Sequence, residues 1–331
     1  WTGFSKNAFA NLKIDWLGKR KTAYVISGII IAAGIGSMFT RGFDFGVDFK
    51  GGYSYNVEFA QDVTADQVRE ALTAPFDGTP TVKAVDTDNT FSIVTDYNID
   101  NDDDNADSLV VVKLNEGLNT IVGGDLDYDK FRRTDASGVT HITALTKVGP
   151  TIADDIKSSS WKAAIFALLL IFFYIFIRFS KWQYSLGAVA ALFHDVLVVM
   201  SIFSLLHGVL PFAMEIDQAF IAALLSVIGY SINDTVVVFD RIRENIGEMK
   251  SSKLSDIYNI SIDQTISRTL ITSVTTFLTV LILFIFGGDV IRGFSFALMV
   301  GIVVGTYSSI FVASPISLDL LQRGLTEEEE A

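Results

Sequence analysis

Two acidic residues stand inside stretches that are otherwise almost wholly apolar, and they are the residues of this chain best suited to chemistry. Asp234 lies in the run IGYSINDTVVVFDRIREN, and Asp195 follows His194 in a second apolar run. A carboxylate within a membrane is costly, so it needs a partner or a task. Desolvation favours the neutral carboxyl, which could then take up and release a proton near neutral pH. The alternative for both is a purely structural ion pair or interhelical hydrogen bond.

Three further residues are placed to assist these carboxylates. Arg268 precedes a later apolar run. There it could anchor the chain at the membrane surface, or reach inward as a counter-ion for Asp234. Gly301 and Gly305 form a G-x-x-x-G pattern. Small residues at this spacing let two helices approach closely, so we expect a tight helix contact there.

The elements that must hold these residues are membrane helices. Half of the 331 residues are apolar and 19% are charged, and the mean hydropathy is +0.41. A typical soluble protein has about 25% charged residues. A span of about 30 Å needs about 20 apolar helical residues. We therefore expect a polytopic α-helical membrane protein with six transmembrane helices, at 22–40, 161–180, 183–206, 217–240, 269–287 and 291–315, the last ending near Pro315.

Composition excludes several classes of function. The chain has no Cys and three His, which excludes disulfides and thiol chemistry and argues against a metal site. A net charge of −13 argues against nucleic-acid binding, which needs a basic face. The GxSxG and HExxH patterns of hydrolases are missing from the sequence, so no enzyme activity is expected.

The distribution of Lys and Arg predicts the orientation. The segments before the first span, between the second and third, between the fourth and fifth, and after the sixth contain 13 of them. The short loops on the opposite side contain only Arg292. Cytoplasmic loops carry the excess of positive charge. Both termini are thus expected in the cytoplasm, with an N-terminal segment at 1–21, an amphipathic loop at 241–268 and an acidic tail at 316–331. Residues 41–158 are expected outside.

The outer segment predicts a small α+β domain. Residues 42–157 hold 22 acidic and 9 basic residues. Alternating and helical patterns give the order β-α-β-β-α-β, typical of a ferredoxin-like fold, with strands at 53–60, 81–86, 91–97 and 139–148 and helices at 64–74 and 106–121. The acidic run 100–107 lacks the Gly and Glu of a calcium loop, so a solvated loop is expected.

A glycine-rich segment leads from the first span into this domain. Gly46, Gly51 and Gly52 interrupt the sequence FGVDFKGG, which also contains Asp48. Glycine allows backbone conformations that other residues avoid. We expect a tight, hinge-like connection at this segment, called the glycine segment (residues 45–52) below.

Several of these stretches resemble the SecD/SecF family of protein-export membrane proteins. The strongest are residues 228–245, 267–276 and 286–316, and residues 45–52, 148–156 and 194–203 agree with them. Together they run from about residue 20 to 316. Two features depart from the family pattern. Lys50 occupies a position usually given to a small polar residue, and the acidic run 100–107 is unfamiliar.

The resemblance implies the fold of half an RND-superfamily transporter in the cell inner membrane. It implies a SecD partner, separate or fused, and work beside the SecYEG channel, with YajC and YidC as further partners and an exported unfolded polypeptide as substrate. The proton-motive force would drive export, with H⁺ or Na⁺ as coupling ion and no other cofactor. Asp234 and Arg268 would belong to the proton path, and Asp195 is a further candidate.

Two other functions stay open at this point. An RND-type efflux half-transporter would need a large apolar pocket in a larger outer domain. A non-transporting membrane scaffold would tolerate the substitution Asp234→Asn.

Overall fold

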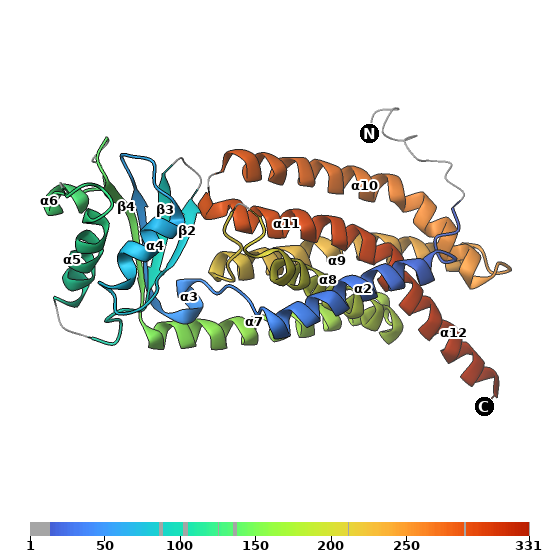
Figure 1. The fold of residues 1–331 in the computed structure, drawn as a ribbon. Coiled ribbons are helices and arrows are strands. Elements are labelled where there is room, and N and C mark those ends of the chain that lie inside the picture. The colour runs from blue at the N-terminus through green and yellow to red at the C-terminus, as the bar shows by residue number, and fades with distance from the viewer. Residues whose placement is uncertain are drawn as a thin grey trace.

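Six long helices lie side by side, and a small sheet domain covers one end of the bundle (Figure 1). The structure is a computed structural model that describes residues 14–85, 89–101, 105–124, 126–134, 138–210, 212–287 and 289–330. The long helices are α2 (Arg20–Thr40), α7 (Pro150–Phe179), α8 (Trp182–Leu206), α9 (Gln218–Glu248), α10 (Leu254–Phe286) and α11 (Asp289–Ser308), which continues into α12 (Ser314–Glu330). All six are long and apolar enough to cross a membrane.

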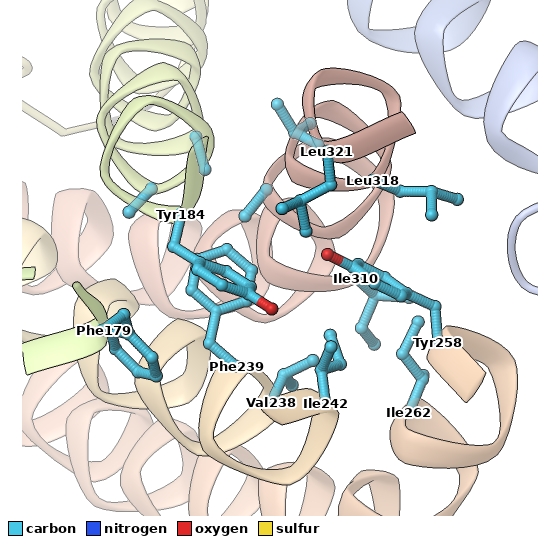
Figure 2. Close-up of a cluster of buried hydrophobic side chains, with 14 of the residues drawn as sticks. Phe179, Tyr184, Val238, Phe239, Ile242, Tyr258, Ile262, Ile310, Leu318 and Leu321 are labelled. Atoms are coloured by element: carbon cyan, nitrogen blue, oxygen red, sulfur yellow. The ribbon is translucent and has the colours of Figure 1, made fainter. Parts of the chain in front are cut away.

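Three helices extend well beyond the ranges expected from hydropathy. Helix α7 begins at Pro150, eleven residues before the expected start at 161 and within the range 41–158 expected for the outer domain. Helix α9 reaches Glu248 and α10 begins at Leu254, so only a short turn separates them. In place of the amphipathic loop expected at 241–268, the structure therefore has the last part of α9 and, after the turn, the first part of α10. Its apolar residues Tyr258 and Ile262 are buried against α9 and α12 (Figure 2). Burial against neighbours extends α9 and α10 past the apolar runs.

Figure 2 shows this cluster, to which α7, α8, α9, α10 and α12 all contribute side chains. In Figure 1, α12 lies at the end of the bundle away from the sheet domain. Val238 and Ile242 of α9, Tyr258 of α10 and Leu318 of α12 meet there, and all are at least 97% buried. Of the predicted N-terminal segment, residues 1–13 lie outside the described residues. Next to them, the Trp16 indole donates to Asp263 of α10 at 2.6 Å.

The sixth helix also passes the point where the sequence predicted its end. Pro315 lies inside one helical path because a π-helical turn, Ser309–Ala313, precedes it. Proline has no N–H and crowds the preceding turn, and the wider π-helical turn leaves room for its ring. The Ser314 hydroxyl donates to the Ser309 carbonyl at 2.8 Å and satisfies one of the acceptors in that turn.

The sheet domain confirms the predicted order of strands and helices. Its strands β1 (Gly52–Glu58), β2 (Thr81–Val85), β3 (Thr90–Thr95) and β4 (His141–Val148) form one antiparallel sheet in the order β2-β3-β1-β4. Helices α4 (Ala65–Thr73) and α5 (Ala106–Asn119) pack on one face, with the short α6 (Tyr128–Phe131) beside α5 (Figure 1). This is the β-α-β-β-α-β arrangement of a ferredoxin-like domain.

Local sequence sets these elements. Thr64 and Gln67 form a capping box at the start of α4, within the helix predicted at 64–74. Tyr53 and Tyr55 of β1 alternate inward and are fully buried beneath the helices. Residues 102–104 of the acidic run lie outside the described residues. At the end of that run, the Asp107 carboxylate accepts hydrogen bonds from the Tyr53 hydroxyl at 2.7 Å and from Lys147 at 2.6 Å.

Candidate functional site

Asp234 lies near the middle of α9 and is 2% exposed. Two hydroxyl groups approach its Oδ2 atom, from Thr306 of α11 at 3.4 Å and from Ser273 of α10 at 3.5 Å. These two hydroxyls are only 2.6 Å apart, and the Tyr230 hydroxyl donates to Ser273 at 3.1 Å. The carboxylate is therefore surrounded by a compact group of hydroxyls from three helices.

The hydrogen bonds to Asp234 are long, and each of these hydroxyls has a closer acceptor. The Ser273 hydroxyl lies 2.8 Å from the Thr269 carbonyl, and the Thr306 hydroxyl lies 3.0 Å from the Ile302 carbonyl. A hydroxyl has one proton to donate. The helix carbonyls thus compete with the carboxylate, which is poorly compensated for its burial. Such hydroxyls can turn toward a charged carboxylate and back to the helix when it is neutral.

Arg268 is not an ion-pair partner of Asp234 in this structure. Its side chain is exposed, and it lies inside α10 rather than before it. Among the described residues, no Lys, Arg or His nitrogen lies within 4 Å of the Asp234 carboxylate. Of the polar residues on α10, Ser273 makes the direct contact with this carboxylate.

Asp195 on α8 has the opposite character. It is fully buried, and its Oδ2 accepts from the Ser231 hydroxyl of α9 at 2.7 Å and from the Ser308 hydroxyl of α11 at 2.8 Å. Its Oδ1 lies 3.0 Å from Nδ1 of His194. These hydroxyl distances are those of well-formed O–H···O hydrogen bonds. The two buried carboxylates therefore differ in how well the protein stabilises their charge.

His194 and Asp195 contact each other although they are neighbours on one helix. Neighbouring residues on a helix point about 100° apart, which by itself predicts that the two side chains do not pair. The short Asp195 side chain and the imidazole ring nevertheless reach each other across that angle. The Nε2 atom of His194 lies 2.8 Å from the Ser27 hydroxyl of α2, and its ring stacks on Tyr307 of α11.

The protons of this network can be counted. The Ser27 and Tyr307 hydroxyls are 3.0 Å apart, and the Tyr307 hydroxyl also lies 2.7 Å from the Ala23 carbonyl, which can only accept. If Tyr307 donates to Ala23, Ser27 must donate to Tyr307, and His194 Nε2–H must donate to Ser27. The contact between His194 Nδ1 and Asp195 Oδ1 then needs one proton, which either atom can carry. His194 thus links Asp195 to the Ser27 and Tyr307 hydroxyls through a continuous hydrogen-bonded chain.

Close contact between α9 and α11 holds both carboxylates in place. A Cβ atom at Gly301 would lie 2.0 Å from Cγ2 of Val227, and one at Gly305 would lie 2.9 Å from Cβ of Ser231. Any larger residue would force the helices apart. Because α11 provides Thr306 to one carboxylate and Ser308 to the other, this contact sets the geometry of both sites.

The glycine segment is bound tightly to the start of α9. The Gly46 N–H donates to the Ile216 carbonyl at 3.0 Å, and the Ile216 N–H donates to the Asp44 carbonyl at 2.7 Å. The Asp48 carboxylate accepts from the N–H of Gln218, the first residue of α9, at 3.0 Å. A carboxylate at a helix N-terminus satisfies a free N–H and opposes the helix dipole. The segment therefore couples the sheet domain to α9 directly.

Gly51 and Gly52 shape the other end of this segment. Their φ angles are +76° and +129°, which side chains disfavour. A Cβ at Gly52 would lie 2.8 Å from the Thr95 carbonyl oxygen of β3. The chain thus turns sharply into β1 while remaining pressed against the sheet.

Charged side chains reinforce the junction between the two parts. Lys83 of β2 forms ion pairs with Asp44 and, at 2.6 Å, with Glu215. Burial opposes the charge of Lys83, but the two carboxylates outweigh it and raise its pKa. The carboxylate of Asp217, the N-cap of α9, accepts a hydrogen bond from the Phe220 N–H at 2.7 Å. Burial, helped by Glu215 and Asp48, raises the pKa of Asp217 to about 6.

Sequence reasoning missed several of the residues that complete these sites. Ser27 and Tyr307 were not singled out, although a serine in the first apolar span was a visible signal. The capping of Gln218 by Asp48 and the ion pair between Lys83 and Glu215 had no signal in the sequence, because each joins residues more than 100 positions apart.

Comparison with known proteins gives this arrangement a family. Residues 129–323 match the family described as "Protein export membrane protein SecD/SecF, C-terminal", and residues 36–63 match the "SecD/SecF GG Motif". The chain belongs to the SecD/SecF family. The second match contains the glycine segment, so the part of the chain that joins the sheet domain to α9 is itself a family signature.

Individual SecD/SecF proteins align over nearly the whole chain. The Rhodothermus marinus protein translocase subunit SecF is 46% identical over 95% of this chain and 96% of its own length. The Haemophilus influenzae SecF is 36% identical over 92% and 86%. Each is a protein to which this chain is similar over the full set of helices.

Two solved SecDF structures share the fold. A crystal structure of SecDF from Thermus thermophilus, described as a translocon-associated membrane protein, has a TM-score of 0.78 and 30% identity over 95% of this chain. A SecDF in a super-membrane-facing form has a TM-score of 0.66, also at 30% identity. The chain spans about 39–40% of those SecDF chains.

Proposed function

We propose that this chain acts as the SecF-type subunit of a protein-export complex, in which it works with a SecD partner and uses the proton-motive force to promote export. Its relatives of matching length are protein translocase SecF subunits, and its larger structural neighbours are SecDF proteins. Lys and Arg in the short loops support cytoplasmic termini in the inner membrane and place the sheet domain outside. The SecYEG channel, YajC and YidC are the proposed further partners.

The observation that carries the proposal is the contrast between the two buried carboxylates. Asp195 has two hydroxyl hydrogen bonds, at 2.7 and 2.8 Å, and one contact with the His194 imidazole at 3.0 Å, whereas Asp234 has two long hydrogen bonds, at 3.4 and 3.5 Å. A buried charge without strong compensation readily takes up a proton. We therefore assign proton loading to Asp234 and a stabilising or second relay role to Asp195.

Arg268 completes the proposed relay from the other helix. It lies five residues, or about 7.5 Å along α10, before Ser273, which contacts Asp234. When Asp234 is ionised, attraction by Arg268 and a turn of the Ser273 hydroxyl would stabilise the charge. Protonation removes both interactions, so the packing of α9 against α10 responds to the protonation state. H⁺ is the proposed coupling ion, with Na⁺ as the alternative.

The path from proton to domain movement runs along α9. Asp234 lies in this helix, and its first N–H is held by Asp48 of the glycine segment. A shift of α9 would therefore be transmitted to the sheet domain. One proton crossing 100 mV supplies about 2.3 kcal/mol. Strongly biasing a two-state element takes about 5.5 kcal/mol, so roughly two to three protons per cycle would suffice.

The test compares Asp234→Asn with Asp256→Asn in cells that also carry the SecD partner. Asp256 is an exposed carboxylate on α10, so it controls for the loss of one charge. Export of a secreted reporter is measured with and without an uncoupler, after insertion has been verified. We expect poor, uncoupler-insensitive export for Asp234→Asn and normal export for Asp256→Asn.

A second comparison separates the roles within the relay. Arg268→Gln should reduce proton-driven export, whereas Arg268→Lys should retain part of it. Normal, uncoupler-sensitive export by Asp234→Asn would refute the assignment and favour a non-transporting scaffold. If a variant instead kept its proton flux but lost export, the defect would lie in the coupling of proton flux to export.

A further inference from the structure

A cavity of about 600 Å³ lies near the sheet-domain end of the bundle, away from the carboxylates. It is enclosed by α7, α8, α9 and the segment that leads into the sheet domain, and most of its lining is apolar. Among its lining residues are Phe45, Phe49, Trp161, Met200, Phe220 and Leu224. The volume falls within the range of about 300–1,000 Å³ typical of small-molecule sites.

The cavity borders on the membrane because α7 packs loosely. Only 6% of the most apolar window of α7 is buried inside the protein. Toward the far end, Phe179 joins α7 to the bundle, while Figure 1 shows the helix running along the outside of the bundle toward the sheet domain. Trp161 is 69% exposed beside the cavity. Tryptophan at such a position is typical of the membrane–water interface.

Two lysines lie at the cavity, Lys50 from the glycine segment and Lys157 from α7. Their side chains are 51% and 46% exposed. Lys157 pairs with Asp154 at 3.2 Å, and Lys50 lies 4.0 Å from Asp44, which is shared with Lys83. Exposed pairs of this kind are weak. Both ammonium groups can therefore turn to a phosphate that arrives at the interface.

We propose that this cavity binds an anionic phospholipid, with an acyl chain among the aromatic and aliphatic side chains and the phosphate between Lys50 and Lys157. The three features coincide in one place: an apolar space, access from the bilayer, and two cations at headgroup depth. A zwitterionic lipid would fill the space but would add a quaternary ammonium beside the lysines. A polar peptide would leave its backbone groups unpaired against the apolar lining.

The proposed orientation places this lipid in the outer leaflet, but the selectivity does not depend on that orientation. Each lysine near a membrane surface contributes about 1 kcal/mol of attraction, which is about fivefold in affinity. We therefore expect phosphatidylglycerol to be preferred over phosphatidylcholine by about 25-fold. The failure of this preference would leave the role of Asp234 untouched, because the two tests use different residues and different readouts.

The experiment uses the full chain with its SecD partner in phosphatidylcholine nanodiscs. The chain has no Cys, so Ala164→Cys, in the wall of the cavity, gives this chain a single cysteine for attaching a fluorophore. Quenching is measured while phosphatidylglycerol or phosphatidylcholine carrying a nitroxide on the acyl chain is added. The variants are the double variant Lys50→Gln/Lys157→Gln and the two corresponding single variants. Lys162→Gln is the control, because it removes the same charge as each single variant. Lys162 is exposed on α7 and does not line the cavity.

We expect the preference to fall to about fivefold in each single variant, to disappear in the double variant, and to persist in Lys162→Gln. Melting curves check that the double variant is folded. Equal quenching by the two lipids, or a preference that survives in the double variant, would overturn the proposal. The proposal would also be overturned if neither lipid quenched the fluorophore at residue 164 and this residue cross-linked to the partner chain, because the cavity would then be a protein interface.

Discussion

Replacement of Gly301 by alanine tests whether the close contact of α9 and α11 sets the geometry of the carboxylate sites. The new Cβ would lie 2.0 Å from Cγ2 and 2.7 Å from Cγ1 of Val227, which is itself buried. Overpacking of this kind costs about 1–3 kcal/mol. Alanine otherwise favours a helix over glycine by about 1 kcal/mol. Gly229→Ala on α9 is the matched control, because its Cβ would meet no atom within 4 Å.

The assay measures unfolding in mixed micelles for Gly301→Ala, Gly229→Ala, Val227→Ala and the double variant at 301 and 227. We expect Gly301→Ala to be about 1–3 kcal/mol less stable than Gly229→Ala. Removal of the two methyl groups of Val227 should restore much of this loss, so the two changes should be strongly non-additive. Equal stability of the two glycine variants, or additive effects at 301 and 227, would refute the proposed contact.

Three further predictions concern the junction of the sheet domain and α9. Asp217→Asn keeps a residue that can cap α9 but removes the titrating carboxyl. The pKa of Asp217 is about 6 in the folded protein and 3.8 ordinarily, so this group makes the wild type less stable as pH rises from 4 to 6. The melting temperature of the variant should therefore gain on that of the wild type over this pH range. Lys83→Met leaves two carboxylates without their cation, so the junction should lose about 1–3 kcal/mol and amide exchange at Gly46 should speed up; unchanged exchange would contradict this. Gly52→Ala should cost about 1–3 kcal/mol in thermal melting because of its φ of +129°. Gly78→Ala is the control and should be close to neutral, because Gly78 has no positive φ and its Cβ would meet only the Phe76 carbonyl oxygen, at 3.8 Å.

Much of the fold could be predicted because its determinants are local. Alternation in β1 and β3, the Thr64 cap and the apolar runs each act within one element, so their period and spacing are visible in the sequence. Element ends were predicted less well. The extension of α10 back to Leu254 depends on Tyr258 being buried by other helices, and hydropathy along one segment does not show this.

The sequence by itself determined that this protein spans the membrane with six helices, carries one ferredoxin-like domain after the first of them, and has two carboxylates within its apolar stretches. These features are visible in the sequence because the free-energy cost of placing a charged side chain or an unpaired backbone group in the bilayer depends on each residue and its segment, not on distant contacts.

Only the tertiary structure decided what each carboxylate does. Asp234 and Asp195 look alike along the chain, but three helices bring short, charge-stabilising hydrogen bonds to Asp195 and long, shared ones to Asp234. The capping of α9 by Asp48 likewise joins residues 170 positions apart. Hydrogen-bond strength depends on tenths of an ångström between such distant residues, and only the packed helices fix those distances.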